Sequence, residues 1–210
     1  IRDSPYSRYQ NLLVDKILDD INQLWVSDIT YYNIAENFYY IVLIMDVYSR
    51  KIVGYSAAGD MRAENNIAAL KMAFATRKQT TFKNLIHHSD RGGQYISNDY
   101  VNLLTSAKIK ISMCNEVHEN AHIERVNGTI KNQYLRYRNI TTYEELCFHV
   151  TKDIKTYNEE RPHSSLNDLS PNSFEQYVKE LTLESRPKLA IWTCAETKII
   201  NPNQLVLEFE

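Results

Sequence analysis

Three acidic residues, Asp28, Asp90 and Glu124, are the candidates for chemistry in this sequence. Asp90 stands at the end of the apolar run that begins at Leu85, and a pair of glycines turns the chain away soon after it. Asp28 lies inside a segment rich in β-branched and aromatic residues, where an unpaired carboxylate is costly. Each acid taken alone also has an ordinary explanation. Asp90 can belong to a polar turn, Asp28 can be a hydrogen-bonded structural aspartate, and Glu124 can lie on a solvated helix face.

The three acids gain a common explanation if the fold brings them together. Carboxylates in close proximity repel one another, so one of them stays protonated unless a divalent cation neutralises the group. Ligands that are all oxygen suit Mg²⁺ or Mn²⁺ better than zinc. Such ions support in-line displacement at phosphorus, because they activate the attacking oxygen and stabilise the leaving one. The acids therefore indicate a metal-dependent phosphoryl-transfer site.

Strands at two distant parts of the chain must position the two aspartates. Short connections between three strand-like segments predict an antiparallel meander, and a helix between two later strands predicts a parallel pair with a right-handed crossover. If the first strand of the meander lies beside the fourth strand, Asp28 and Asp90 are neighbours. We therefore predict an α/β fold with a five-stranded mixed sheet flanked by helices, whose strands lie at 24–32, 38–48, 51–57, 85–88 and 109–113, with helices at 63–76 and at 97–106, the latter capped by Ser97.

A further helix carries Glu124. Its apolar stripe, which we expect to face the core, consists of Ile123, Val126, Ile130, Tyr134 and Tyr137. A second face, which we expect to point away from that stripe, carries Asn120, Glu124, Asn127 and Lys131. An ordinary solvated face is the simpler interpretation of this second set. Two more helices are expected to follow, one capped by Thr141 or Thr142 and running to about Tyr157, and one that starts at Pro171 and ends near Lys179, before short β-like segments at 189–193, 198–200 and 205–209.

The composition, with 43% hydrophobic and 24% charged residues among 210, predicts one core domain with appendages. We divide the chain into a connector (1–22), a core domain (23–180) and a C-terminal extension (181–210). The first residue is Ile1 rather than methionine, which we interpret as the start of a fragment. No apolar run approaches the ~20 residues that cross a membrane, and three cysteines without metal spacing favour a reducing compartment. We therefore expect a soluble, intracellular protein that does not enter a membrane.

The charge pattern is compatible with DNA binding in one segment only. The net charge of −2 is unusual for a nucleic-acid-binding protein. Between positions 125 and 143, however, the only charged side chains are positive: Arg125, Lys131, Arg136 and Arg138. This segment is predicted to face phosphates.

Several motifs, in order, resemble the DDE-type transposases of bacterial insertion sequences. More narrowly, they resemble the family whose transposase is made by frameshifting between two reading frames and whose core is similar to retroviral integrase. The motifs span roughly residues 22–178 and are Trp25–Thr30, His87–Tyr95, Ser112-Met113, Asn120-Ala121, Glu124, Asn127–Lys131, Tyr157-Asn158, His163–Leu166 and Ser170-Pro171. The resemblance implies an RNase H-like fold in which Asp28, Asp90 and Glu124 bind Mg²⁺ or Mn²⁺, with two ions per active site when DNA is bound.

The resemblance also implies an activity and partners. It implies a transposase catalytic core that cleaves DNA strands at the ends of an insertion sequence and transfers them to a target, in the bacterial cytoplasm near the nucleoid. It implies at least a dimer on DNA. The residue expected to contact the transposon end is Lys131, and the other candidates for DNA binding are Asn127, Arg125, Asn120 and Arg91.

One departure concerns the loop before Glu124. Thirty-three residues separate Asp90 from Glu124, slightly fewer than is usual in the family, and the run before the glutamate reads Glu116-Val-His-Glu-Asn-Ala121. We expect the three acids to be retained and the contacts made by this loop to differ.

Two other interpretations compete. His118-Glu119-Asn120-Ala121-His122 matches the His-Glu-x-x-His pattern of zinc peptidases, with Glu144 or Glu145 as a third ligand. Tight zinc binding with peptide cleavage would support a peptidase, and Mg²⁺-dependent DNA nicking would exclude it. A catalytically silent relative that only binds or assembles DNA is the second alternative. His87 and His88 are expected to be packing and hydrogen-bonding residues rather than metal ligands.

Overall fold

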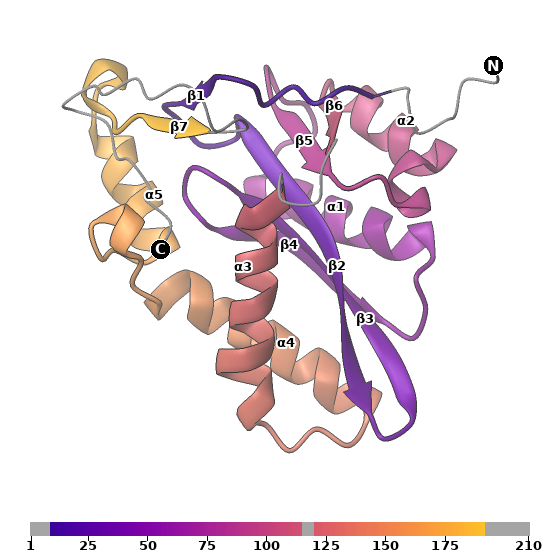
Figure 1. Cartoon of the computed structure of the whole chain (residues 1–210). Coiled ribbons are helices and arrows are strands. Elements are labelled where there is room, and N and C mark those ends of the chain that lie inside the picture. The colour runs from indigo at the N-terminus through magenta and orange to yellow at the C-terminus, as the bar shows by residue number, and fades with distance from the viewer. Residues whose placement is uncertain (1–8, 115–119, 192–210) are drawn as a thin grey trace.

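A five-stranded mixed sheet forms the centre of the molecule. The computed structural model describes residues 9–114 and 120–191. The strand order is β4-β3-β2-β5-β6, with β2 at Leu24–Ile34, β3 at Asn37–Asp46, β4 at Ile52–Ala58, β5 at Ile86–Ser89 and β6 at Lys110–Met113. The first three strands are antiparallel, and β5 runs parallel to both β2 and β6 (Figure 1). The predicted mixed sheet is confirmed, including the position of the first meander strand beside the fourth strand.

Helices cover both faces of this sheet because its central strands are apolar on both sides. Along β2, Leu24 and Val26 belong to one buried cluster, and Trp25 belongs to the other. The Trp25 cluster includes apolar side chains of α1 (Ala63–Arg77) and α2 (Asn98–Ser106). The opposite cluster includes those of α3 (Ala121–Thr129), α4 (Tyr143–Glu160) and α5 (Pro171–Glu180).

The predicted apolar stripe of the α3 segment fails at its C-terminal end. Ile123, Val126 and Ile130 are buried as expected. After Thr129 the chain continues as a π-helical turn (Ile130–Tyr134) and a 3-10 turn (Leu135–Tyr137). A π turn contains one residue more than an α turn, so the next core position falls on Leu135. Leu135 is fully buried, whereas Tyr137 is 78% exposed, so the expectation that Tyr137 faces the core was wrong.

Two of the three helix starts expected from the sequence are capped by a side-chain hydrogen bond. The Thr142 hydroxyl accepts a hydrogen bond from the Glu145 backbone N–H at 3.2 Å, and the Glu145 carboxylate accepts one from the Thr142 N–H in return, which completes a capping box. Ser170 caps α5, whose first residue is proline. Ser97 precedes α2 but does not cap it, because its hydroxyl donates to the Gln94 carbonyl in the preceding 3-10 turn (Gly93–Ile96).

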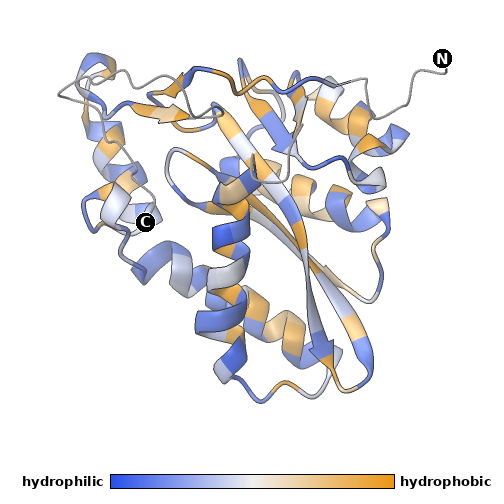
Figure 2. Cartoon of the chain, in the orientation of Figure 1, coloured by the Kyte–Doolittle hydropathy of each residue, from blue (hydrophilic) through white to orange (hydrophobic). Residues whose placement is uncertain are grey.

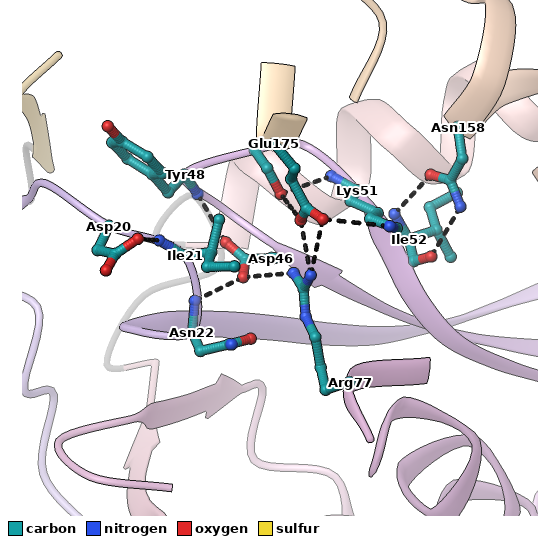
Figure 3. A network of polar contacts seen from close by, with 11 residues as sticks. Asp20, Ile21, Asn22, Asp46, Tyr48, Lys51, Ile52, Arg77, Asn158 and Glu175 are labelled. Carbon is teal, nitrogen blue, oxygen red and sulfur yellow. Dashed lines mark hydrogen bonds and ion pairs between the residues drawn. The ribbon is translucent and has the colours of Figure 1, made fainter. Parts of the chain in front are cut away.

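A buried ion network fastens the two faces of the sheet together (Figure 3). Arg77, in the last turn of α1, contacts Asp46 at the end of β3 at 2.8 Å and Glu175 of α5 at 2.7 Å. Lys51 contacts Glu175 at 3.1 Å, and Ser49 donates a hydrogen bond to the same carboxylate at 2.8 Å. The network therefore joins elements that are far apart in the sequence.

Segments near both ends of the described chain pack on the core. β1 (Lys16–Leu18) pairs antiparallel with β7 (Leu189–Ile191) to form a separate two-stranded sheet. Leu18, Leu189 and Ile191 are buried in the same cluster as the α3–α5 side chains. The segments expected at 198–200 and 205–209 lie outside the described residues. Within the described ranges, no helix combines the length and the apolar character needed to span a bilayer.

Candidate active site

The pairing of β2 with β5 brings Asp28, in the middle of β2, beside the end of β5, where Asp90 follows. The parallel register aligns Ser27 with Ser89, so each aspartate is the next residue along its chain. β2 continues to Ile34, whereas β5 ends at Ser89 and Asp90 enters a loop. The Asp90 carboxylate accepts the Gly92 N–H at 2.9 Å, which is the local hydrogen bond of an Asx turn. The predicted pairing of these two strands is confirmed.

The layer beneath these aspartates is rigid and hydrogen-bonded. The Tyr95 hydroxyl lies 3.0 Å from the Ser27 hydroxyl, and the Tyr100 hydroxyl lies 2.9 Å from His87 Nε2. His88 contacts the Ser112 hydroxyl through Nδ1 at 2.8 Å. Burial lowers the pKa of His87 to about 3, so this imidazole is neutral. Both histidines are packing and hydrogen-bonding residues, as expected.

α3 lies against β2 and is fastened to it by two amides. Asn127 Nδ2 donates to Asp28 Oδ2 at 2.7 Å, and Asn120 Nδ2 donates to the Ser27 carbonyl at 3.2 Å. Both asparagines are buried, so the expectation that their face points away from the core was wrong for them. Glu124, on the same face, is exposed, in keeping with the largely hydrophilic colouring of α3 in Figure 2. The helix thus places Glu124 on the side of α3 that faces β2.

The charges of Asp90 and Glu124 influence the ionisation of Asp28. The pKa of Asp28 is raised to about 6, chiefly because burial disfavours its charge, and the negative charges of Asp90 and Glu124 raise it further. The Ile29 N–H and the Asn127 amide oppose this shift by hydrogen bonding to the carboxylate. Asp28 is therefore a carboxylate whose charge would be favoured by a nearby cation.

The carboxylate oxygens of the three acids are suitable ligands for a hard divalent cation, although they are not grouped around one position. Among residues 9–114 and 120–191, no three histidine, cysteine, aspartate or glutamate side chains lie close enough together to hold a metal ion. Asp90 and Glu124 are exposed, one on a loop and one on a helix face, and Asp28 is half-buried, so packing does not enclose the other two carboxylates. An all-oxygen set of this kind suits Mg²⁺ or Mn²⁺.

The candidate DNA-binding residues do not share one surface. Lys131 lies beyond Glu124 on the same side, with Nζ 4.4 Å from the centroid of the exposed Tyr31 ring. Arg91 is exposed in the loop after Asp90. Arg125 instead lines a cavity on another side of α3. Arg138, part of the positive segment, pairs with the buried Asp153 at 2.6 Å.

The zinc-peptidase pattern finds no support in its described part. His118 and Glu119 lie outside the described residues. His122 Nδ1 lies 2.8 Å from the Arg50 guanidinium, and Glu145 belongs to the capping box of α4. A nitrogen that faces an arginine is unsuited to bind a cation.

The raised pKa of Asp28 predicts that Asp28→Asn stabilises the metal-free protein. The folded chain binds the Asp28 proton more tightly than the unfolded chain, so this contribution to stability is present below pH ~4 and is lost as the pH rises through about 6. Asparagine removes the disfavoured charge and keeps an oxygen for Asn127. We expect the free energy of unfolding to rise by ~1–2 kcal/mol at neutral pH and not at pH ~4, measured by urea unfolding with a chelator. An equal change at both pH values would contradict the assignment.

Comparison with known proteins links this geometry to one family. Two models described as "Integrase core domain" match residues 20–118 and 106–171. The insertion element IS600 uncharacterized 31 kDa protein of Shigella sonnei is 37% identical over 163 residues, which are 76% of this chain and 59% of the relative. Transposase InsF for insertion sequence IS3A of Escherichia coli (strain K12) is 34% identical over 157 residues, 73% of this chain and 54% of the relative. The chain thus spans a little over half the length of these relatives.

Solved structures share the fold at lower identity. The HTLV-2 integrase catalytic core domain in complex with magnesium, in its dimeric form, superposes with a TM-score of 0.61 at 22% identity and covers 74% of this chain and 97% of that one. A chain of the simian T-cell lymphotropic virus intasome in complex with PP2A regulatory subunit B56 gamma gives a TM-score of 0.62 at 15% identity, with 92% of this chain and 63% of that one covered. The RNase H-like fold expected from the sequence is confirmed.

Proposed function

Because the chain belongs to the integrase core family of DDE-type insertion-sequence transposases, we propose that residues 23–180 form the catalytic core that cuts and joins DNA at the ends of an insertion sequence. Residues 1–22 would act as a connector and 181–210 as an extension. The observation that carries the proposal is the parallel register of β2 and β5, which places Asp28 beside Asp90, together with the 2.7 Å hydrogen bond by which Asn127 of α3 holds the Asp28 carboxylate. The charges of Asp90 and Glu124, from two other elements, both act on Asp28, which supports the assignment of the three acids to one site.

The chain's own residues would hold and orient the reacting groups. Asp28 in β2 and Asp90 just after β5 would bind divalent cations, and Glu124 would complete the site from α3. Asn127 would fix the orientation of Asp28 through its 2.7 Å hydrogen bond. When bound, two Mg²⁺ or Mn²⁺ ions would activate the attacking oxygen and stabilise the leaving one.

Two displacements at phosphorus would follow at this site. In the first, the oxygen of water forms a bond to phosphorus, the bond to the 3′ oxygen breaks, and a 3′-hydroxyl is released. In the second, that 3′-hydroxyl attacks a phosphodiester of the target, and a new 3′-hydroxyl leaves. The proton lost by each nucleophile would pass to Glu124 or to solvent. Holding two element ends together would require at least two copies of the chain on DNA.

A nicking assay tests the proposal. The chain is incubated with labelled duplexes that contain the element's end, with Mg²⁺, Mn²⁺ or Ca²⁺ as the cation. We expect nicking at the end with Mg²⁺ and Mn²⁺, followed by strand transfer, and binding without cleavage with Ca²⁺. DNA binding without nicking under any cation would favour the catalytically silent relative, and zinc-dependent peptide cleavage would favour the peptidase.

Lys131→Ala is expected to weaken DNA binding without changing which sequence is preferred. The Lys131 ammonium, placed over the Tyr31 ring, would contact a phosphate of the bound end. Loss of one phosphate contact lowers the slope of log affinity against log salt by about 1. Fluorescence anisotropy across a salt series measures the slope, and Lys71→Ala, an exposed lysine on α1, serves as the control. Identical slopes for both variants would count against this role of Lys131.

A further inference from the structure

A basic site, separate from the three acids, lies on the side of α3 that turns away from Glu124. It is a cavity of about 210 Å³ between α3, Arg50 in the turn before β4, and the end of α4 with the segment that follows it. His122, Arg125 and Thr129 contribute from α3 at steps of three and four residues, so they share one face of the helix. At about 100° per residue, that face lies roughly opposite the one that carries Glu124 and Lys131.

The cavity concentrates positive charge. Three guanidinium groups, those of Arg50, Arg125 and Arg161, line it, and none of the described lining residues is acidic. Arg50 is only 8% exposed, so water solvates its charge poorly. Burial lowers the pKa of Arg50 to about 10, and the charge of Arg125 contributes to that shift. Such a cluster favours an anion inside the cavity.

The two imidazoles of the cavity are neutral. Burial lowers the pKa of His122 to about 3 and that of His163 to about 4, and in both cases neighbouring arginines lower it further. His122 Nδ1 lies 2.8 Å from Arg50 Nη1. A guanidinium only donates, so Nδ1 accepts and the proton of His122 is on Nε2.

One buried polar atom in the cavity lacks a partner. His163 Nε2 is buried and makes no hydrogen bond with any described residue. The His163 ring is packed edge-to-face against Tyr157, with 5.1 Å between the ring centroids, which restricts its orientation. A nitrogen in this position, among three guanidinium groups, is free to hydrogen-bond to an anion that enters the cavity. A ligand that accepts hydrogen bonds from His163 and from the arginines would satisfy this site.

We propose that this cavity binds a phosphate group, and that its occupant in the working protein is a backbone phosphodiester of DNA at a distance from the bond that is cut. Guanidinium groups match the geometry of phosphate oxygens and bind them with charge-assisted hydrogen bonds. A volume of about 210 Å³ is many times what a single water needs, which leaves room for a phosphate group. The choice of DNA as the source rests on the proposed function, whereas the affinity for phosphate does not.

Arg161 is the residue through which the proposal is best tested. It is half-buried, lies after the end of α4, and donates to Gln133 Oε1 at 2.6 Å, an exposed contact. Arg161→Gln should therefore fold, whereas the buried Arg50 is a poor choice for substitution. Arg161→Lys keeps the charge and loses the planar fork. Arg62→Gln removes an exposed arginine that pairs only at the surface, with Asp60, and is the control of equal net charge.

The first measurement is a titration with inorganic phosphate, which does not depend on the nuclease proposal. We expect saturable binding followed by NMR, with a shift of the His163 ring nitrogens in the unsubstituted chain. Affinity should fall about tenfold in Arg161→Gln, less in Arg161→Lys, and not at all in Arg62→Gln. The wild-type His163 signal keeps the test valid even if a variant unfolds. Absence of saturable binding, or equal loss in Arg161→Gln and Arg62→Gln, would overturn the site.

The second measurement distinguishes DNA from free phosphate as the occupant. Duplex binding is measured by anisotropy with Ca²⁺, under which no strand is cut. Arg161→Gln should lower the salt slope by about 1, and inorganic phosphate should compete at this contact in the unsubstituted chain only. If phosphate binds and the slope does not change, the DNA assignment is wrong. A chain that binds phosphate at Arg161 but never nicks DNA would overturn the proposed function and leave the anion site standing.

Discussion

Glu124→Gln is expected to lower DNA strand cleavage by about a thousandfold or more, equivalent to ~4 kcal/mol or more of the activation barrier. Glutamine has nearly the shape of glutamate but is neutral, so it neither neutralises a divalent cation nor takes a proton from the nucleophile. Glu124 is exposed on α3, so the fold should be unaffected. Initial nicking rates with Mg²⁺ at saturating DNA measure the effect.

A matched variant separates this effect from a general loss of negative charge. Glu64→Gln changes an exposed glutamate in the first turn of α1, on the other face of the sheet, and is expected to retain nicking within about twofold. DNA binding with Ca²⁺ should not weaken in Glu124→Gln, because a negative charge near phosphates is removed. A Glu124→Gln protein that nicks at the normal rate would remove this residue from the mechanism, while the fold and family assignment would remain.

The strand framework of the site was predictable because its signals are local. Runs of β-branched residues with short connections predicted the meander, and a helix between strands predicted the parallel pair that aligns Ser27 with Ser89. The positions of Asp28 and Asp90 follow directly from that pairing. Thr142 and Pro171 marked helix starts through hydrogen bonding and φ restriction within a few residues.

The parts that sequence reasoning missed depend on contacts between distant elements. Polarity suggested that Asn120 and Asn127 were solvated, but both are buried where they donate hydrogen bonds to β2. The π turn at Ile130 moves the core position to Leu135, and nothing in the local periodicity marks the extra residue. The basic cavity was missed for the same reason. Arg50, Arg125 and Arg161 are far apart in the sequence, and the only local signal was the Arg-Pro-His-Ser-Ser run that begins at Arg161.

The Tyr157-Asn158 motif, which supported the family resemblance, has a structural explanation. Asn158 accepts the Ile52 N–H through Oδ1 and donates to the Ile52 carbonyl through Nδ2, each at 2.9 Å. The Tyr157 hydroxyl donates to the Arg50 carbonyl at 3.1 Å. These contacts hold α4 to the start of β4. The same contacts place Arg50 at the cavity, so the motif positions a proposed binding residue.

Arg77→Met is expected to destabilise the fold by about 3–5 kcal/mol. Methionine has a comparable length but no charge, so Asp46 and Glu175 would remain buried without their guanidinium (Figure 3). Burial already raises the pKa of Asp46 despite Arg77. For Glu175, burial also acts upward, but Arg77 and Lys51 outweigh it and the pKa is lowered.

The loss in Arg77→Met should depend on pH in a direction that identifies the cause. Without Arg77, the folded-state pKa of both carboxyl groups rises above the unfolded value, so the folded chain gains protons that the unfolded chain does not hold. Stability is then lost as the pH rises through those pKa values, and urea unfolding should reveal a larger deficit at pH ~8 than at pH ~5.5. Arg62→Gln, which breaks the exposed pair with Asp60, should cost less than ~1 kcal/mol at either pH. If Arg77→Met lost stability equally at both pH values, packing of the arginine stem rather than its charge would be the reason that α1, β3 and α5 stay together.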